Sequence, residues 1–292
     1  MPRLAAGVLL LCCTAAALEA PLRALRAGLI DRATATTLMR SATVRFDADG
    51  WARDAARSLR DEGFCVVRAG GAQISDRILE SCRGVASARL SDLLARVGRR
   101  GVDLWPDASE PFRYLELVHR EGTGRYDMPL PWCVDGQAGD VSLPAAAETA
   151  FGELHAAMDG VARPVVGALW AEQAVSDEMR AGCVISEPGA LAQPSHRDGP
   201  DGLVTVFAPL TAFVPRNGPT EVSPATHRGG DDSSSVAPLL QPGDVLLFDY
   251  RCLHRGLANE GNSRREVAYA VYARDGVRDV QNFPSATTLE FD

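Results

Sequence analysis

The sequence predicts a mainly β protein with flanking helices, in which a double-stranded β-helix, a cupin-like variant of the jelly-roll barrel, rests on an N-terminal helical support. Short segments with alternating apolar and polar residues, typical of half-buried strands, follow one another along the second half of the chain. Turn-forming Gly, Pro, Asn and Asp separate these segments. The expected strands cover residues 183–187, 203–214, 221–223, 245–254 and 264–274.

The helical support is predicted from apolar residues that recur at helical spacing. A first amphipathic helix begins near Trp51 and ends at Gly63, and a short buried strand, 64–67, follows it. A long helix is expected over 75–97, where Ser75 suits the N-terminal cap. Another is expected over 145–169.

The first 45 residues resemble a targeting leader. An apolar run from Leu4 to Leu18 follows Arg3, as in a signal peptide, and residues 21–45 carry five arginines against one acid, as in a transit peptide. We expect residues 1–45 to direct the protein to the secretory pathway or to an organelle, for which a plastid is one candidate. A simple secreted or mitochondrial protein, or a plain N-terminal tail, stays open. Residues 46–292 are expected to form one domain with its core at 183–274.

Composition excludes several classes of function. With a net charge of -8 and no basic cluster, nucleic acid is not an expected partner. No apolar run is long enough for an integral membrane span. All thirty basic residues are arginine, so lysine-based phosphate loops and Schiff-base chemistry are absent. The seven cysteines are sparse and lack metal-binding spacing, which argues against a disulfide framework or a zinc ribbon.

A candidate metal site begins with His196 and Asp198, which lie two residues apart. On a strand, side chains at i and i+2 share a face, so this imidazole and carboxylate could bind one metal ion. His254 is the candidate third ligand, because it ends the uncharged and therefore inward face of the predicted strand 245–254. Each feature has an ordinary alternative, since a lone His-x-Asp arises by chance and a lone histidine on an apolar face is often structural. His227 competes as the second histidine.

A turn-rich loop after His254 leads into strand 264–274, and the two strands are predicted to form a hairpin. Arg265 shares the inward face with Val267 and Tyr269, whereas Arg264 points outward. A buried arginine needs an anionic partner. The carboxylate of a chelating co-substrate would provide it beside a metal.

Residues 112–132 are dense in arginine, aromatic residues and glycine. They form either a plain strand and loop that cover the barrel, or a substrate-binding lip. In the second interpretation Arg120 and Arg125 would hold an anionic group and Tyr126 would offer a flat apolar contact.

Four segments together resemble the phytanoyl-CoA dioxygenase family of Fe(II)- and 2-oxoglutarate-dependent oxygenases: 187–198, 217–228, 241–249 and 254–265. The resemblance implies Fe(II) on His196, Asp198 and His254, with O2 as the oxidant. It implies 2-oxoglutarate on Arg265, eleven residues after His254, and places Gln193 on the cofactor side. His227 falls in a loop element of the family and not at the distal ligand position.

The resemblance implies hydroxylation of a small organic metabolite, which the arginines of the lip suggest is anionic. Asp198 speaks against halogenation, because related halogenases give up this carboxylate to make room for halide. Two alternatives stay open, a non-catalytic ligand-binding barrel and a zinc hydrolase. Arg265 in register with the metal ligands argues against the hydrolase, which would not need it. The sequence does not indicate an oligomeric state.

Overall fold

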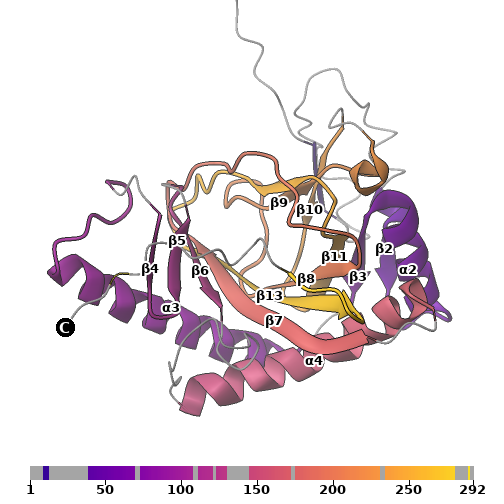
Figure 1. The fold of residues 1–292 in the computed structure, drawn as a ribbon, viewed down its shortest axis with the longest axis horizontal. Helices are drawn as coiled ribbons and strands as arrows, with labels where there is room; N and C mark the ends of the chain where they lie inside the picture. The colour runs from indigo at the N-terminus through magenta and orange to yellow at the C-terminus, as the bar shows by residue number, and fades with distance from the viewer. Residues whose placement is uncertain are drawn as a thin grey trace, which may run out of the picture.

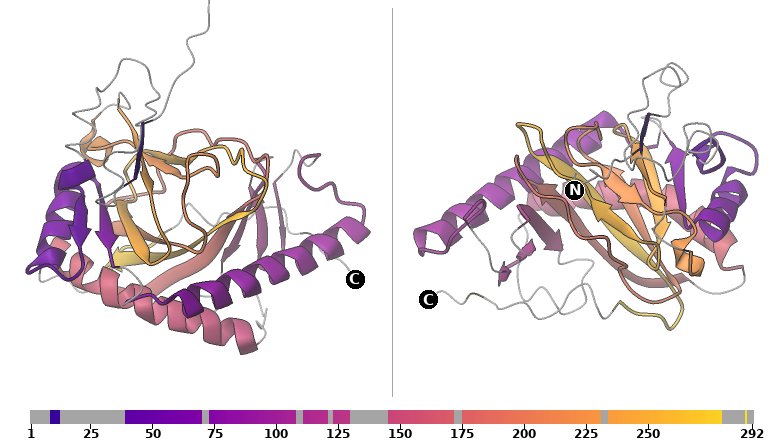
Figure 2. Two further views of the ribbon diagram at one scale, coloured as in Figure 1. Left: turned by 180° about the vertical axis from the view of Figure 1, so that it is seen from behind. Right: turned by 90° about the horizontal axis from the view of Figure 1, so that it is seen from above.

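The computed structural model describes residues 9–12, 39–69, 73–107, 111–120, 123–129, 145–171, 175–230, 234–279 and 289. Two β-sheets face each other across the barrel interior, and helices lie against the outer face of the larger sheet (Figure 1). Views from behind and from above show the same layers (Figure 2).

The larger sheet has nine strands in the order β2-β3-β11-β8-β13-β7-β6-β5-β4. Their bounds are β2 Thr43–Arg45, β3 Phe64–Arg68, β4 Phe112–Tyr114, β5 Leu117–Arg120, β6 Arg125–Pro129, β7 Val175–Ser186, β8 Leu203–Pro209, β11 Asp244–Asp249 and β13 Arg265–Arg274. The smaller sheet has the order β1-β10-β9-β12, with β1 Leu9–Cys12, β9 Thr220–Val222, β10 Val236–Leu239 and β12 His254–Gly256.

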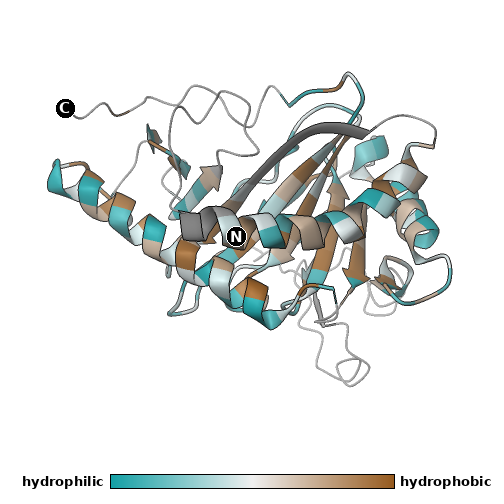
Figure 3. Ribbon diagram, turned by 90° about the horizontal axis from the view of Figure 1, so that it is seen from below, coloured by the Kyte–Doolittle hydropathy of each residue, from teal (hydrophilic) through white to brown (hydrophobic). Residues whose placement is uncertain are grey.

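Three α-helices and one short 3-10 helix complete the described elements: α2 Trp51–Glu62, α3 Asp76–Arg99, α4 Ala145–Leu169 and η3 Thr226–Arg228. Hydrophilic and hydrophobic bands alternate along the helices, while the strands behind them are mostly hydrophobic (Figure 3). Gly63 ends α2 with φ 82°, and a Cβ there would lie 2.5 Å from the ring of His227. Only glycine suits this position.

Alternation along β11 divides the apolar core into two layers. Val245 and Leu247 pack toward the helices, whereas Leu246 and Phe248 pack into the barrel interior. Both faces of the strand are therefore covered, which explains why it reads as a continuous apolar run.

The mainly β jelly-roll class with helical support is confirmed, and the helix predicted over 145–169 coincides with α4. Two details are wrong. Residues 245–254 are not one strand: β11 ends at Asp249, the chain turns as the N–H of Cys252 donates to the carbonyl of Asp249 at 2.8 Å, and β12 then begins. The predicted hairpin is also wrong, because β12 pairs with β9 whereas β13 pairs with β7 and β8. The intervening loop crosses from one sheet to the other.

Residues ahead of the predicted domain boundary at 45 belong to the fold. Met39 and Ala42 are buried, and β2 pairs with β3 in the larger sheet. Apart from β1 and this segment, the predicted leader lies outside the described residues. No helix in the described ranges is long and apolar enough to cross a membrane.

Candidate active site

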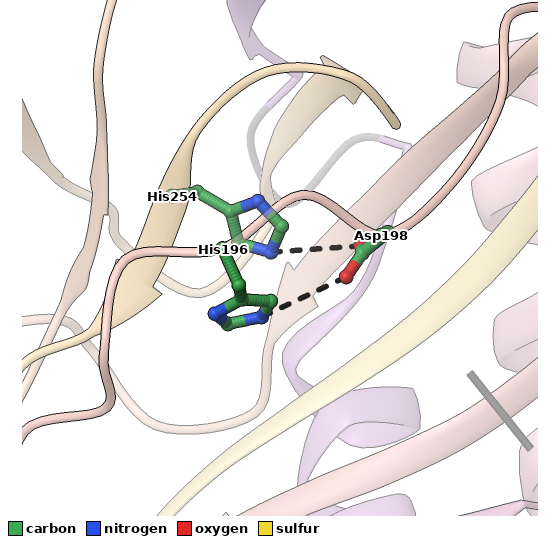
Figure 4. A group of neighbouring side chains, drawn as sticks. All are labelled: His196, Asp198 and His254. Carbon is green, nitrogen blue, oxygen red and sulfur yellow. Dashed lines mark ion pairs between the residues drawn. The ribbon is translucent and has the colours of Figure 1, made fainter. Parts of the chain in front are cut away.

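The side chains of His196, Asp198 and His254 meet in the barrel interior, with one potential ligand atom from each lying within 4.8 Å of the others (Figure 4). His196 and Asp198 belong to the segment between β7 and β8, which is not a strand but makes an isolated bridge between His196 and His254. His196 and His254 exchange two backbone hydrogen bonds of 3.0 Å, and the N–H of Asp198 donates to the carbonyl of Tyr250 at 2.8 Å. The backbone thus brings the three residues together.

Hydrogen bonds orient both imidazoles. The Nδ1 of His196 lies 2.9 Å from the carbonyl of Pro194, and the Nδ1 of His254 lies 3.0 Å from that of Cys252. A carbonyl can only accept, so each Nδ1 carries the proton and each Nε2 keeps a lone pair. The two Nε2 atoms face Asp198, at 3.7 Å from Oδ1 for His196 and 3.5 Å from Oδ2 for His254.

Burial, and then the neighbouring His254, lower the pKa of His196, which favours the neutral imidazole that binds a metal. Thr205 on β8 donates a hydrogen bond of 3.4 Å to Oδ2 of Asp198 and helps to fix the carboxylate. Two imidazoles and one carboxylate on one side of a cavity form the donor set that suits non-haem Fe(II).

The three residues line a cleft that is partly open to solvent. Apolar side chains from the larger sheet form one part of its wall, namely Val184, Phe207, Val267 and Val271. Arg265, Val267, Tyr269 and Val271 all line it, as the face assignment for strand 264–274 requires. Arg264 points to the other side, where it pairs with Glu187 at 2.8 Å and contacts α3 through Ser87.

A row of polar residues crosses three adjacent strands at one end of the cleft. Arg125 on β6 and Arg265 on β13 both pair in register with Ser186 on β7. Their exposed fractions are 1%, 2% and 0%, and neither the Nε atoms of the two arginines nor the Oγ of Ser186 has a hydrogen-bond partner among the described residues. Unsatisfied buried donors are costly, so this row of Arg125, Ser186 and Arg265, which we call the anion row, is suited to bind an anion.

Burial lowers the pKa of Arg265 to about 10, and burial together with the charge of Arg265 lowers that of Arg125 to about 9. Both guanidiniums therefore stay charged at neutral pH. Within the described part of the chain, Arg265 has no ion pair with a carboxylate, and its guanidinium lies 5.2 Å from the centre of the Phe213 ring. A buried guanidinium in this setting is suited to bind the anionic group of a ligand.

Gln193 reaches the same end of the cleft. Its Oε1 accepts from the N–H of Gly256 at 3.0 Å, and its own N–H donates to the carbonyl of Gly256 at 2.9 Å. A Cβ on Gly256 would lie 2.9 Å from both the Nε of Arg125 and the Oε1 of Gln193. The glycine lets these two side chains approach β12.

The predicted substrate lip needs correction. Arg125 lies beside Arg265, and its guanidinium donates to the carbonyls of Leu191 and Leu257, so it belongs to the anion row. Arg120 lines the cleft but pairs with Asp127 at 2.5 Å. Tyr126 is wrong as a cleft residue, because it follows Arg125 directly on β6 and points to the opposite face, where it packs in the core beside His119.

Among the polar residues that line the cleft, sequence reasoning missed Asp127, Thr205 and Thr220. Asp127 could have been found, since it lies two residues after Arg125 and shares its face. His227 does not belong to the group of candidate metal ligands, because its ring is turned to the end of α2, where its Nε2 lies 3.1 Å from the carbonyl of Arg60.

A jelly-roll barrel that gathers two histidines and an aspartate in one cleft has the donor set of a candidate metal centre. Residues 59–267, well over half of the chain, match the family model described as phytanoyl-CoA dioxygenase (PhyH). The protein belongs to this family.

Curated relatives match over shorter segments. Dioxygenase FrzG of Cladobotryum sp is 32% identical over 98 aligned positions, and the match covers 25% of this chain and 32% of that protein. Dioxygenase aneA of Aspergillus aculeatus is 33% identical over 109 aligned positions, and the match covers 30% of this chain and 37% of that protein. The matches thus span about a third of these two relatives' length.

Solved structures share the fold. AviO1 from Streptomyces viridochromogenes Tue57 has a TM-score of 0.52 and 18% identity, covering 77% of this chain and 95% of its own. The non-heme alpha ketoglutarate dependent epimerase SnoN from nogalamycin biosynthesis has a TM-score of 0.51 and 15% identity, covering 84% of this chain and 98% of its own.

Proposed function

We propose that this protein is an Fe(II)- and 2-oxoglutarate-dependent dioxygenase that hydroxylates a small organic molecule. The observation that carries the proposal is a triad of candidate metal ligands in the same cleft as a buried arginine that has no anionic partner among the described residues. The two features match the two groups that such an enzyme holds, an iron ion and a dicarboxylate.

The residues fit both groups. His196, Asp198 and His254 offer two neutral nitrogens and one anionic oxygen, and Nδ1 hydrogen bonds already direct both rings. Arg265 would hold the distal carboxylate of 2-oxoglutarate, with Arg125 and Ser186 on the neighbouring strands as further donors. Gln193 would help to shape the same end of the cleft.

When bound, Fe(II) with 2-oxoglutarate and O2 would supply the oxidising chemistry that places one oxygen atom on substrate carbon as succinate and CO2 form. The chain's own contribution is to keep the ligands on one side of the metal and to hold the co-substrate by its far end. Phe207 and Val271 give the wall of the cleft an apolar character, which would limit the access of water to a bound substrate. Asp198 fills the third ligand position, which supports hydroxylation over halogenation.

Two other functions use the same barrel. A non-catalytic binding protein would need neither oriented imidazoles nor a metal. A zinc hydrolase would use the triad but has no need for the row of Arg125, Ser186 and Arg265. The anion row therefore supports the oxygenase over the hydrolase.

The test is to mix the purified protein anaerobically with Fe(II) and 2-oxoglutarate. We expect the weak visible charge-transfer band of a chelated complex, and succinate release once air is admitted. Zn(II) in place of Fe(II) should give neither signal. A protein that binds Fe(II) yet shows no band and releases no succinate would contradict the proposal.

We also propose that the first twenty residues act as a cleavable leader, on the basis of their sequence pattern, so that the mature protein would lack β1. Protein isolated from its own cell is expected to begin after Ala20. N-terminal sequencing or intact-mass measurement checks this, and an intact Met1 on the accumulated protein would contradict it.

A further inference from the structure

A second polar cluster in the cleft consists of Arg120 on β5, Asp127 on β6 and Tyr269 on β13. Arg120 pairs with Asp127 at 2.5 Å, and the hydroxyl of Tyr269 donates to the other carboxylate oxygen at 2.8 Å. All three side chains line the same cleft as the metal triad. We call them the Asp127 network.

The Asp127 network depends on a glycine in the strand between β6 and β13. Tyr269 lies opposite Gly182 on β7, and its ring crosses that position to reach Asp127 on the next strand. A Cβ on Gly182 would lie 2.4 Å from the hydroxyl of Tyr269. Asp127 itself is buried, which makes the ion pair hard to displace.

Charge is distributed unevenly along the cleft. Asp127 balances the guanidinium of Arg120, whereas Arg125 and Arg265 have no carboxylate partner in the described part of the chain. The capacity to bind anions is thus concentrated at the co-substrate end. Arg120 and Asp127 together carry no net charge, so an anionic substrate group beside the Asp127 network would lose its hydration without gaining an unpaired cation.

The hydrogen bonding of the network also points to one kind of group. The proton of the Tyr269 hydroxyl is committed to Asp127, and burial and that carboxylate raise the pKa of Tyr269 well above its usual range. The phenol oxygen therefore keeps its proton and presents lone pairs to the cleft. A lone pair beside apolar side chains such as Val271 and Phe207 suits a hydroxyl donor on a carbon skeleton.

We propose that the Asp127 network selects an uncharged, hydroxyl-bearing and otherwise apolar substrate, and disfavours carboxylates. This inference rests on the proposed oxygenase function and replaces the anionic substrate that the arginines of residues 112–132 suggested.

The test uses matched pairs of a carboxylic acid and the primary alcohol of the same skeleton, drawn from fatty, terpenoid and polycyclic aromatic compounds. Substrate-stimulated succinate release and product mass are measured with iron and 2-oxoglutarate saturating. We expect the alcohols to exceed their acids in kcat/KM by about tenfold or more. Acids that stimulate as well as or better than their alcohols would overturn the inference. Loss of all succinate release and of the charge-transfer band would instead contradict the oxygenase function.

Asp127→Asn identifies the origin of the selectivity, because it removes the charge and keeps the shape. We expect the alcohol-to-acid ratio to fall several-fold in this variant, with circular dichroism and 2-oxoglutarate titration as checks on folding. Asp244→Asn is the matched control, since Asp244 is another buried carboxylate paired with an arginine, Arg68, but lies outside the cleft. An unchanged ratio in folded Asp127→Asn, or an equal change in Asp244→Asn, would show that the network does not set selectivity.

Discussion

Replacing His254 with alanine is expected to abolish iron-dependent 2-oxoglutarate turnover while the protein stays folded. The change removes one of three ligands and leaves a site with one imidazole and one carboxylate. Loss of a residue that only hydrogen-bonds to a metal ligand typically costs about 10–100-fold in metal affinity or activity, and loss of a ligand itself should cost more. Iron bound per chain after desalting, together with succinate release, checks the result. His196→Ala and Asp198→Ala should behave alike.

His227→Ala is the matched control, since His227 is also a buried histidine in the same half of the chain. Its ring contacts the end of α2 and packs against Gly63, so its loss should lower the melting temperature without removing iron. If His227→Ala lost iron while His254→Ala kept it, the assignment of the distal ligand would be wrong.

Replacing Arg265 with glutamine is expected to raise the KM for 2-oxoglutarate by about 100-fold or more. Breaking a buried charge pair from one side costs about 3–5 kcal/mol, and each 1.4 kcal/mol corresponds to about tenfold in affinity. Steady-state kinetics with 2-oxoglutarate as the varied substrate measure the effect. Iron content should stay near that of the wild type, because Arg265 is not among the candidate metal ligands.

Arg264→Gln is the neighbouring control. Arg264 points away from the cleft and joins β13 to Glu187 and to α3, so its loss should reduce stability and leave the KM for 2-oxoglutarate unchanged. Equal KM changes in the two variants would show that Arg265 is not the specific anchor.

The sequence by itself was sufficient to predict the residues that meet at the candidate metal site and the inward direction of Arg265. His196 and Asp198 are two residues apart in an extended segment, and Arg265 shares a strand with Val267, Tyr269 and Val271. These relations are local, because period-two geometry fixes which neighbours share a face. The resemblance to the phytanoyl-CoA dioxygenase family then linked the segment of His196 and Asp198 with His254 and Arg265, which lie more than fifty residues further along the chain.

Local patterns failed where both faces of an element are covered. The uncharged inward face of β11, Leu246 and Phe248, continues at the same spacing as the buried Tyr250 and Cys252, so the period-two pattern does not mark the turn that separates β11 from β12. On β6, Tyr126 is buried against the helices while Arg125 is buried in the cleft. Composition alone could not distinguish these two faces.

Only the tertiary structure decided which polar groups stand beside each other across strands. Ser186 lies between Arg125 and Arg265 because three strands pair in one register, and Tyr269 reaches Asp127 because Gly182 leaves room on the strand between them. Strand register depends on contacts between segments far apart in the chain, and a shift by one residue would turn each side chain to the opposite face. The residues of the metal site therefore follow from the sequence, whereas the charge balance of the cleft follows from the pairing of β5, β6, β7 and β13.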